Sequence, residues 1–418
     1  MKKFGYYLEK PTLRFNSAST FASHKFPRSG IKKFGPYDST IFELDKIKAG
    51  IIYPNNMEGS KNIFVNSLTK GEGQFEGFKK WFRVDLEIVE EKPLDLTNIN
   101  IENQALDIMQ SDIDIIYLLF PQKEEHLYSK FKSIFSGNGL PSQFLTVEKI
   151  RANNIEWVIE NIALASYAKV GGTPWVVSKN LNEPDELLIG VSRVQDKSKK
   201  YIIGFVTLFT QNGEFILLHS KAPVIKWDDY INGLKLLLIE AFQAFCRIKG
   251  KPKSIILHFR KKPGFKELEA IKNALLEIGD IPYALIHLNE FSNIHLFDTS
   301  DTTYIPLSGL ITKLSTKKFL LLLDGRTERY GRKKIGVPSL LDISIDNRST
   351  IDIDEESSRL IKQIFNISHI NWRGFNANLS PITLNYSRLI SKVVSDIGID
   401  KWNNIITSGK MMNKAWFL

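Results

Sequence analysis

The sequence predicts an α/β protein in which a Rossmann-like domain precedes an RNase H-like domain. A chain of 418 residues has room for two or three ordinary domains, and 43% hydrophobic residues are enough to fill their cores. Strand and helix patterns alternate through the first half, which favours a parallel sheet covered on both faces. The second half instead opens with three strand patterns in quick succession, followed by helix, strand, helix and strand. That order is typical of an RNase H-like fold.

The first half begins with a turn-rich segment, residues 1–38, in which no helix is expected. The strands expected after it are 51–53, 81–89, 113–120 and a short one near Gln143, and the helices are 61–69, 101–110, 124–135 and 153–169. A Gly-x-Gly-x-x-Gly fingerprint is absent from the sequence, so a dinucleotide is not indicated.

The second half follows a linker from Trp175 to Leu187. Its expected strands are 187–194, 201–209, 215–220, 254–258, 283–288 and 317–323, and its expected helices are 229–248, 266–278, 354–367 and 386–397. Asn212-Gly213 between the second and third strands is a strong hairpin signal, because both residues tolerate a positive φ.

The charge balance favours an anionic partner. Lysine and arginine exceed the acids by 56 − 46 = 10, and the sequence pI is about 9.3, which indicates nucleic acid in preference to an acidic membrane surface. The single cysteine, Cys246, excludes an intrachain disulfide and a cysteine zinc site. The start Met1-Lys2-Lys3-Phe4 has no apolar signal region, and no apolar run is long enough to span a membrane, so we expect a cytoplasmic protein.

Four side chains in the middle of the chain suit a terminal phosphate. Tyr128 and Lys132 are four residues apart on one expected helix and therefore share a face. Gln143 follows at a strand, and Lys169 precedes the helix stop signal Gly171-Gly172. Two ammonium groups and an amide can donate charge-assisted hydrogen bonds to a phosphate, while the phenol ring can stack on the adjacent base.

This order of Tyr, Lys, Gln and Lys resembles the guide 5′-phosphate pocket in the MID domain of Argonaute proteins. The segment Lys169–Trp175 is similar to the junction between MID and PIWI domains in that family. The other segments that carry the resemblance are Gly35-Pro36-Tyr37-Asp38, Asn371–Phe375, Pro381–Tyr386 and the ending Trp416-Phe417-Leu418. The chain thus resembles a short prokaryotic Argonaute with a lead-in at 1–38, a MID domain at 39–175 and a PIWI domain at 176–418.

The resemblance implies a guide-dependent function in antiviral defence. It implies binding of a 5′-phosphorylated RNA or DNA guide, recognition of a complementary strand, and a separately encoded partner with PAZ-like and effector functions; a homodimer is left open. It places Arg373 beside the nucleic acid. Relatives can also hold a Mg²⁺ ion between the guide phosphates and the C-terminal carboxylate, here that of Leu418. The helper Gln of those relatives is replaced here by Ala165, which leaves the ion in question.

The PIWI nuclease site of the family needs clustered carboxylates for two metal ions. Ser192, the run Ile256–Lys261 and Ser387 stand at the three places identified for those acids. We therefore expect no cleavage, so the chain is not an enzyme, and we expect Arg260 and Lys261 to contact the guide or target backbone. The alternative is a nuclease with relocated acids at Asp196, Asp228 or Asp229, and a third hypothesis is a phosphate-binding scaffold without a guide.

Overall fold

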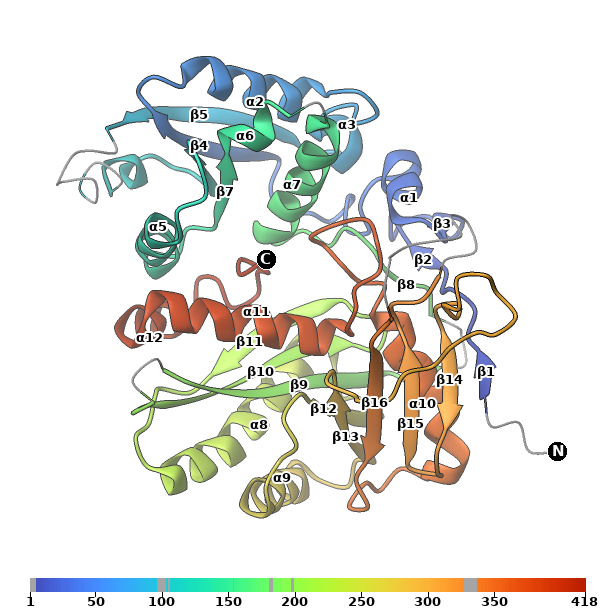
Figure 1. Cartoon of the computed structure of the whole chain (residues 1–418). Helices are drawn as coiled ribbons and strands as arrows, with labels where there is room; N and C mark the ends of the chain where they lie inside the picture. Colours follow the sequence, from blue (N-terminus) through green and yellow to red (C-terminus); the bar gives the residue numbers. More distant parts are fainter. Residues whose placement is uncertain are drawn as a thin grey trace. The chain divides into compact units, whose positions relative to one another are not determined.

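Two compact units make up the chain in this computed structural model (Figure 1). The pocket unit comprises residues 13–176, 372–375 and 392–418, and the nine-strand unit comprises residues 1–12, 177–371 and 376–391. The residues that the structure describes are 5–95, 103, 106–152, 154–179, 183–196, 199–326 and 337–418. The units differ from the sequence-based boundaries, because residues 13–38 and the C-terminal segment 392–418 both pack with the first half of the chain.

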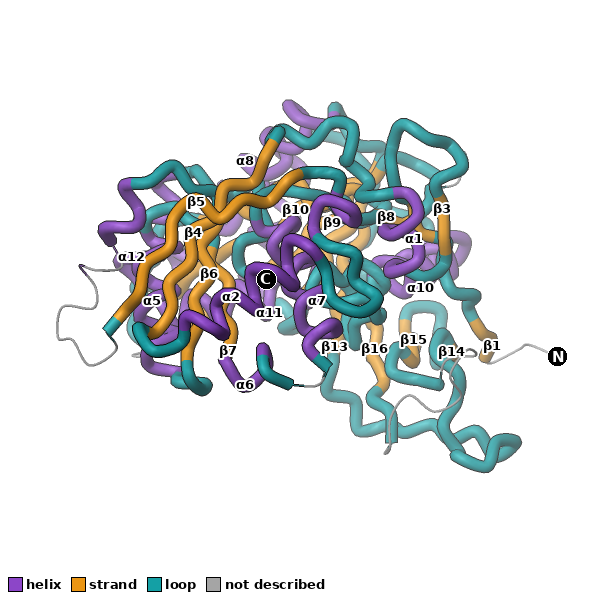
Figure 2. Tube along the Cα trace, turned by 90° about the horizontal axis from the view of Figure 1, so that it is seen from above, coloured by secondary structure: helices purple, strands orange, loops and turns teal. Residues whose placement is uncertain are grey.

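A four-stranded parallel sheet forms the centre of the pocket unit. The strand order is β5-β4-β6-β7, with bounds β4 Lys46–Pro54, β5 Asp85–Leu94, β6 Ile115–Phe120 and β7 Ser142–Thr146. Figure 2 shows these strands running side by side. Every residue of β6 is buried, as expected for a strand of a parallel sheet that is covered on both faces. The Rossmann-like prediction for this half is confirmed.

The helices of the pocket unit include several that the sequence did not suggest. Their bounds are α1 Pro27–Phe34, α2 Glu58–Lys70, α3 Phe78–Phe82, α5 Glu125–Gly137, α6 Val147–Ile150, α7 Ile155–Lys169, α12 Ile399–Ser408 and the 3₁₀ turn Ile108–Gln110. Helix α1 lies in the segment expected to be turn-rich; it starts with Pro27, which is favoured in the first helical turn, and ends at Gly35 with φ +77°. The expected helix at 101–110 falls largely outside the described residues.

The strand expected at 81–89 begins later than predicted. Trp81 and Phe82 end helix α3 instead, and Arg83 takes a left-handed φ of 61° that separates this helix from β5. The alternation of apolar and polar residues was read correctly only from Asp85 onward. A second, small sheet has the strand order β3-β2-β8. Its bounds are β2 Leu13–Arg14, β3 Ser23–His24 and β8 Val176–Val177.

The nine-strand unit has the order β1-β14-β15-β16-β13-β12-β9-β10-β11. The strand bounds are β1 Gly5–Tyr7, β9 Glu186–Gln195, β10 Ile202–Thr210, β11 Phe215–Ser220, β12 Ser254–Phe259, β13 Tyr283–Asn289, β14 Leu310–Lys313, β15 Lys318–Leu322 and β16 Leu340–Ile345. Strands β9, β10 and β11 are antiparallel, whereas β12 runs parallel to β9 and β13. This is the RNase H-like order that the sequence predicts, with the hairpin turn at Gly213, φ +84°.

Within the described ranges, four helices accompany the nine-strand sheet. They are α8 Trp227–Lys249, α9 Phe265–Ile278, α10 Ile353–Ile367 and α11 Ile382–Ile397, the last of which continues past Ser391 into the pocket unit. Helices α8 and α9 pack through Leu234, Leu238 and Ile271 against β9, β10, β12 and β13. Among the described residues, none of the helices has the length and apolar character needed to cross a membrane.

Candidate functional site

Three elements of the pocket unit bring the expected phosphate ligands together. Lys132 lies on α5, Gln143 on β7, and Lys169 is the last residue of α7. The chain turns sharply after Lys169, and the Gly172 amide donates a hydrogen bond to the Tyr167 carbonyl at 2.9 Å. A Cβ on Gly172 would lie 2.3 Å from the Tyr167 ring, so only glycine fits this turn.

Asp38 fixes the same turn from the side. Its Oδ1 accepts a hydrogen bond from the Tyr167 hydroxyl at 2.6 Å, and its Oδ2 accepts one from the Thr173 amide at 2.7 Å. The Gly-Pro-Tyr-Asp motif therefore supports the end of α7, a role that its position far upstream in the sequence did not reveal.

The two lysines are almost completely buried and have only neutral partners. Lys132 is 1% exposed and Lys169 is 2% exposed. The Lys169 ammonium donates to the Ser142 carbonyl at 2.8 Å and to Gln143 Oε1 at 2.6 Å, while the Lys132 ammonium donates to the Trp416 carbonyl at 3.2 Å. Within the described part of the chain, neither ammonium has a carboxylate within ion-pair distance. The ammonium forms of both lysines thus lack a counter-ion.

The pKa values of both lysines are lowered because their ammonium forms are buried without an opposite charge. Burial, assisted by repulsion from Arg373, lowers the pKa of Lys132 to about 7. Burial also holds the pKa of Lys169 well below its usual value, with further lowering by Lys132 and Arg373. A bound anion would favour the charged form of both groups and would supply the missing counter-charge.

Tyr128 lies at the rim of this pocket. Its ring packs against Phe144 with a centroid distance of 4.5 Å and an interplanar angle of 55°, and the side chain is half-buried. Burial raises the pKa of its phenol; Asp396 raises it further, while Arg373 opposes the shift. The ring therefore has a fixed position beside the cationic groups.

Arg373 belongs to the pocket and interacts electrostatically with Lys132, Lys169 and Tyr128. It lies in the segment 372–375. The residue before it, Trp372, donates its indole N–H to the Trp175 carbonyl at 3.2 Å. Phe375 stacks on Trp175 at 5.9 Å between ring centroids. The sequence assigned Arg373 to the nucleic-acid backbone but gave no sign that it approaches Lys132 and Lys169, because no spacing pattern connects such distant segments.

The chain terminus forms another wall of the pocket. Met411, Trp416 and Phe417 are buried at 1%, 0% and 3% exposure, and Leu418 is half-buried. The Trp416 ring centroid lies 5.6 Å from the Lys132 ammonium, within cation–π range. Trp416 belongs to the ending that carries the family resemblance, but no local pattern indicated that its carbonyl accepts a hydrogen bond from Lys132.

The positions expected for nuclease carboxylates lie in the nine-strand unit and are filled by other groups. On β12, His258 pairs in register with Gly190 of β9. Its Nδ1 is 2.9 Å from the Thr383 hydroxyl, and burial lowers its pKa to about 3. Ser387 is buried and donates its hydroxyl to the Thr383 carbonyl at 2.8 Å. The His258 contact thus joins β12 to α11, whereas the Ser387 hydrogen bond lies within α11 and its hydroxyl lies beside Gly190 of β9, where a Cβ would be 3.3 Å away.

A solvent-open pocket brings together Ser192, Arg260 and Lys261 but is not lined by Ser387. The arginines that line it have acidic partners: Arg193 Nε lies 3.2 Å from Glu267, and Arg260 Nε lies 2.9 Å from Glu290. Lys261 is exposed and has no ion pair among the described residues.

The candidate relocated acids do not converge. Asp196 lies beyond β9 and accepts a hydrogen bond from the Tyr201 amide at 2.7 Å. Asp228 and Asp229 are exposed in the first turn of α8, where Asp228 pairs with Lys266 at 2.9 Å. In the described ranges, no group of three or more His, Cys, Asp or Glu side chains is arranged to hold a metal ion.

Comparison with protein families matches residues 115–397, well over half of the chain, to the Piwi domain. The chain belongs to the Piwi domain family. Among relatives, a Piwi protein of Archaeoglobus fulgidus is 24% identical over 408 residues, covering 93% of each chain. The Protein argonaute of Cereibacter sphaeroides is 21% identical over 451 residues, covering 95% of this chain and 57% of the relative. The chain is therefore an Argonaute-type protein.

Solved structures agree with the fold of this Piwi-family chain. Drosophila Piwi superposes with a TM-score of 0.75 at 14% identity, covering 99% of this chain and 56% of that one. Clostridium butyricum Argonaute, solved with a guide DNA and a 19-mer target DNA, gives 0.74 at 19% identity, covering 94% and 53%. The chain thus spans about half the length of the solved structures that it matches. The RNase H-like character of the PIWI half is confirmed.

Proposed function

We propose that this chain binds the 5′-phosphorylated end of a guide strand and, through that guide, recognises a complementary strand without cutting it. The observation that carries the proposal is the pair of buried lysines, Lys132 and Lys169, that lack a counter-ion in the pocket unit. A terminal phosphate would replace their missing counter-charge, with Gln143 assisting and Arg373 adding positive potential. Tyr128 would stack on the first base.

Nucleic acid is the favoured source of this phosphate because of the family and the charge. Relatives of known structure include Clostridium butyricum Argonaute with guide and target DNA and Marinitoga piezophila Argonaute with a 5′ OH guide RNA. A net charge of +10 suits a polyanion better than a small phosphate metabolite. Base pairing would read the sequence, while the protein would contact the backbone.

The test compares 5′-phosphorylated and 5′-hydroxyl oligonucleotides of one sequence, as RNA and as DNA. We expect the phosphorylated forms to bind more tightly. Replacing Lys169 by Gln should weaken them by about 1.5–3 kcal/mol, since a hydrogen bond to a charged group is lost, and should largely spare the hydroxyl forms. Equal loss for both end chemistries would refute the pocket. Affinity that does not depend on strand complementarity would instead support a phosphate-binding scaffold without a guide.

The absence of cleavage is the second part of the proposal. It is supported by Ser192, His258 and Ser387 at the places where the family has acids, and by the scattered positions of Asp196, Asp228 and Asp229. Two-metal hydrolysis needs several carboxylates held rigidly around one phosphate. The purified chain, loaded with a phosphorylated guide and a matched target in Mg²⁺ or Mn²⁺, should give no product. Guide-dependent product that is lost on replacing one of these three aspartates would establish the nuclease alternative.

The third part of the proposal concerns a partner. We infer that a separately encoded protein supplies PAZ-like and effector functions in prokaryotic defence, as the resemblance to short prokaryotic Argonautes implies. Target pairing would then signal through that partner. Affinity purification from the native cell should recover it; a lone polypeptide or a homodimer with unaltered guide and target affinity would contradict this part.

A further inference from the structure

The short segment that carries Arg373 is anchored on both sides of that residue. Trp372 donates its indole N–H to the Trp175 carbonyl, and Phe375 stacks on the Trp175 ring. Phe375 also meets the buried Trp81 edge-on, with 5.8 Å between the ring centroids. The Arg373 side chain itself is exposed, so its position depends on how firmly its two neighbours are held.

Arg28, the second residue of α1, packs on the Phe375 ring. Its guanidinium carbon lies 5.5 Å from the centroid of that ring and 4.2 Å from the ring centroid of Trp157, a residue of α7. Both distances are within cation–π range. The guanidinium thus contacts one aromatic ring from α7 and one from the segment that carries Arg373.

A buried carboxylate fixes the position of this guanidinium. Arg28 donates a hydrogen bond from a terminal nitrogen to Glu160 Oε1, and Glu160 is 2% exposed. In the described ranges, Glu160 has no other ion-pair partner. The two groups stay together because their separation would leave a buried charge without a partner. Glu160 lies on α7, so the helix that ends with Lys169 also holds Arg28 in place.

We propose that Arg28 is a positioning residue for phosphate binding: held by Glu160 and Trp157, it fixes Phe375 and thereby keeps Arg373 beside the two buried lysines. The inference rests on the proposed 5′-phosphate function. Arg28 touches no phosphate in this arrangement and acts only through Arg373. An arginine suits this role better than a lysine, because its planar guanidinium can stack on aromatic rings and pair with a carboxylate at the same time.

The experiment measures the binding of a 5′-phosphorylated mononucleotide in a mutant cycle. The pair variant, Arg28→Gln/Glu160→Gln, removes the ion pair without changing the net charge and leaves no buried charge unpaired. It is made in the native chain and in Arg373→Gln. The matched control is Lys46→Gln/Glu87→Gln, which removes another ion pair of the same unit, with 2.6 Å between its charged atoms.

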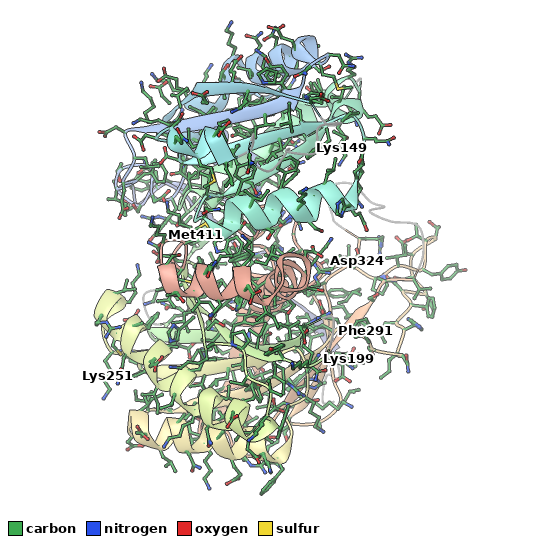
Figure 3. The ribbon with its side chains drawn as sticks, turned by 90° about the vertical axis from the view of Figure 1, so that its left-hand side faces the viewer. Lys149, Lys199, Lys251, Phe291, Asp324 and Met411 are labelled. Atoms are coloured by element: carbon green, nitrogen blue, oxygen red, sulfur yellow. The ribbon has the colours of Figure 1, made fainter. Side chains whose placement is uncertain are left out.

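The control for the loss of one charge in Arg373→Gln is Lys149→Gln. Lys149 is an exposed lysine of α6, and Figure 3 shows it well separated from Met411, which lies in the wall of the pocket. Binding is measured at pH 8. This lies above the pKa of about 7 to which burial raises the Glu160 carboxyl, so the native ion pair is formed.

The pair variant should bind the mononucleotide about fivefold more weakly than the native chain, an effect within the range of coupling between neighbouring residues. The matched control should change the affinity little. In Arg373→Gln, the same two substitutions should have no further effect. Proton uptake on binding should also fall in the pair variant, because Arg373 in its native position lowers the pKa of Lys132 in the free protein. A purely structural role of Arg28 would leave this uptake unchanged.

Native affinity in the pair variant, or an undiminished fivefold loss when Arg373 is already replaced, would overturn the inference. If urea denaturation shows that the pair variant is unfolded, Glu160→Gln alone completes the cycle, because the partly exposed Arg28 can then be hydrated. A native chain without any preference for 5′-phosphate over 5′-hydroxyl would instead refute the proposed function itself.

Discussion

Two sites, one in each unit, handle buried charge in opposite ways. In the pocket unit, Lys132 and Lys169 are buried against neutral carbonyl and amide oxygens. In the nine-strand unit, the 1%-exposed carboxylate of Glu186 accepts two hydrogen bonds from Arg359, at 2.8 and 2.9 Å. It also accepts one from Gln363 at 2.6 Å and one from Ser254 at 2.7 Å.

The difference separates structural charge from functional charge. A buried charge with a complete set of partners is satisfied within the fold and leaves nothing for a ligand to contribute. A buried charge with only neutral partners raises the free energy of the empty site and is relieved when an opposite charge binds. By this criterion, Arg260 with its partner Glu290 is a weaker candidate ligand than Lys132 or Lys169, although the sequence suggested all three.

We expect the largest effect on the free energy of unfolding when the ion pair between Arg359 and the buried Glu186 is broken. Replacing Arg359 by Met should lower the free energy of unfolding by about 3–5 kcal/mol, because it leaves the buried Glu186 carboxylate without its ion pair. Urea denaturation measures the change. Lys362, an exposed residue of the same helix, provides the control Lys362→Met, which should change little. Equal stability of the two variants would show that Glu186 does not need its partner.

A smaller effect of opposite sign is expected in the pocket. Replacing Lys132 by Met keeps most of the side-chain volume and removes an uncompensated charge, so ligand-free stability should rise by roughly 1 kcal/mol. Binding of a 5′-phosphorylated mononucleotide should weaken by about 1.5–3 kcal/mol. Denaturation with and without the nucleotide measures both quantities. A stability loss as large as that of Arg359→Met would mean that the Lys132 charge supports the empty pocket.

The pH dependence of the ligand-free stability provides a further test of whether the Lys132 charge is uncompensated. The folded pKa of Lys132, about 7, lies below the unfolded value of a lysine. Above pH 7 the unfolded chain therefore binds more protons, and ligand-free stability should increase as the pH rises towards the unfolded pKa. The charged groups that interact with Lys132 are Arg373 and Lys169, and Arg373 also acts on the neighbouring Tyr128, together with Asp396.

Phosphate binding at pH 8 should take up protons, because the ligand favours the ammonium form of both lysines. Calorimetry in two buffers of different ionisation enthalpy measures this uptake. It should be smaller in Lys132→Met, while the nucleotide itself contributes little because its second phosphate pKa is about 6. Binding enthalpies that are identical in both buffers would count against coupled protonation.

The smallest effect is expected at the solvent-open pocket of the nine-strand unit. Lys261→Gln should lower the salt slope of guide–target duplex binding by about 0.9, the contribution of one phosphate contact. Arg260→Gln should lower it less, because Glu290 already neutralises that guanidinium. If Arg260→Gln has the larger effect, then the Glu290 pair opens on binding and pairing in the free protein is a poor guide to function.

Local sequence patterns were sufficient to predict much of the fold. The apolar run of β6 indicated a buried parallel strand, and Asn212-Gly213 indicated the hairpin between β10 and β11. Elements that depend on distant partners were missed, including α1, which lies in a segment expected to be turn-rich, and the short strands β1 and β14. Short strands are stabilised by their neighbours in the sheet more than by their own residues.

The family resemblance carried by the sequence also selected Tyr128, Lys132, Gln143 and Lys169, while helical spacing placed Tyr128 and Lys132 on one face. Only the tertiary structure decided that both lysines are buried, that the Trp416 carbonyl receives one of them, and that Arg373 approaches both. The physical reason is that burial and electrostatic potential depend on every charge and dipole in the surroundings, whichever part of the chain supplies them. Residues far apart in the sequence set the pKa of Lys169, and only folding brings them within range of one another.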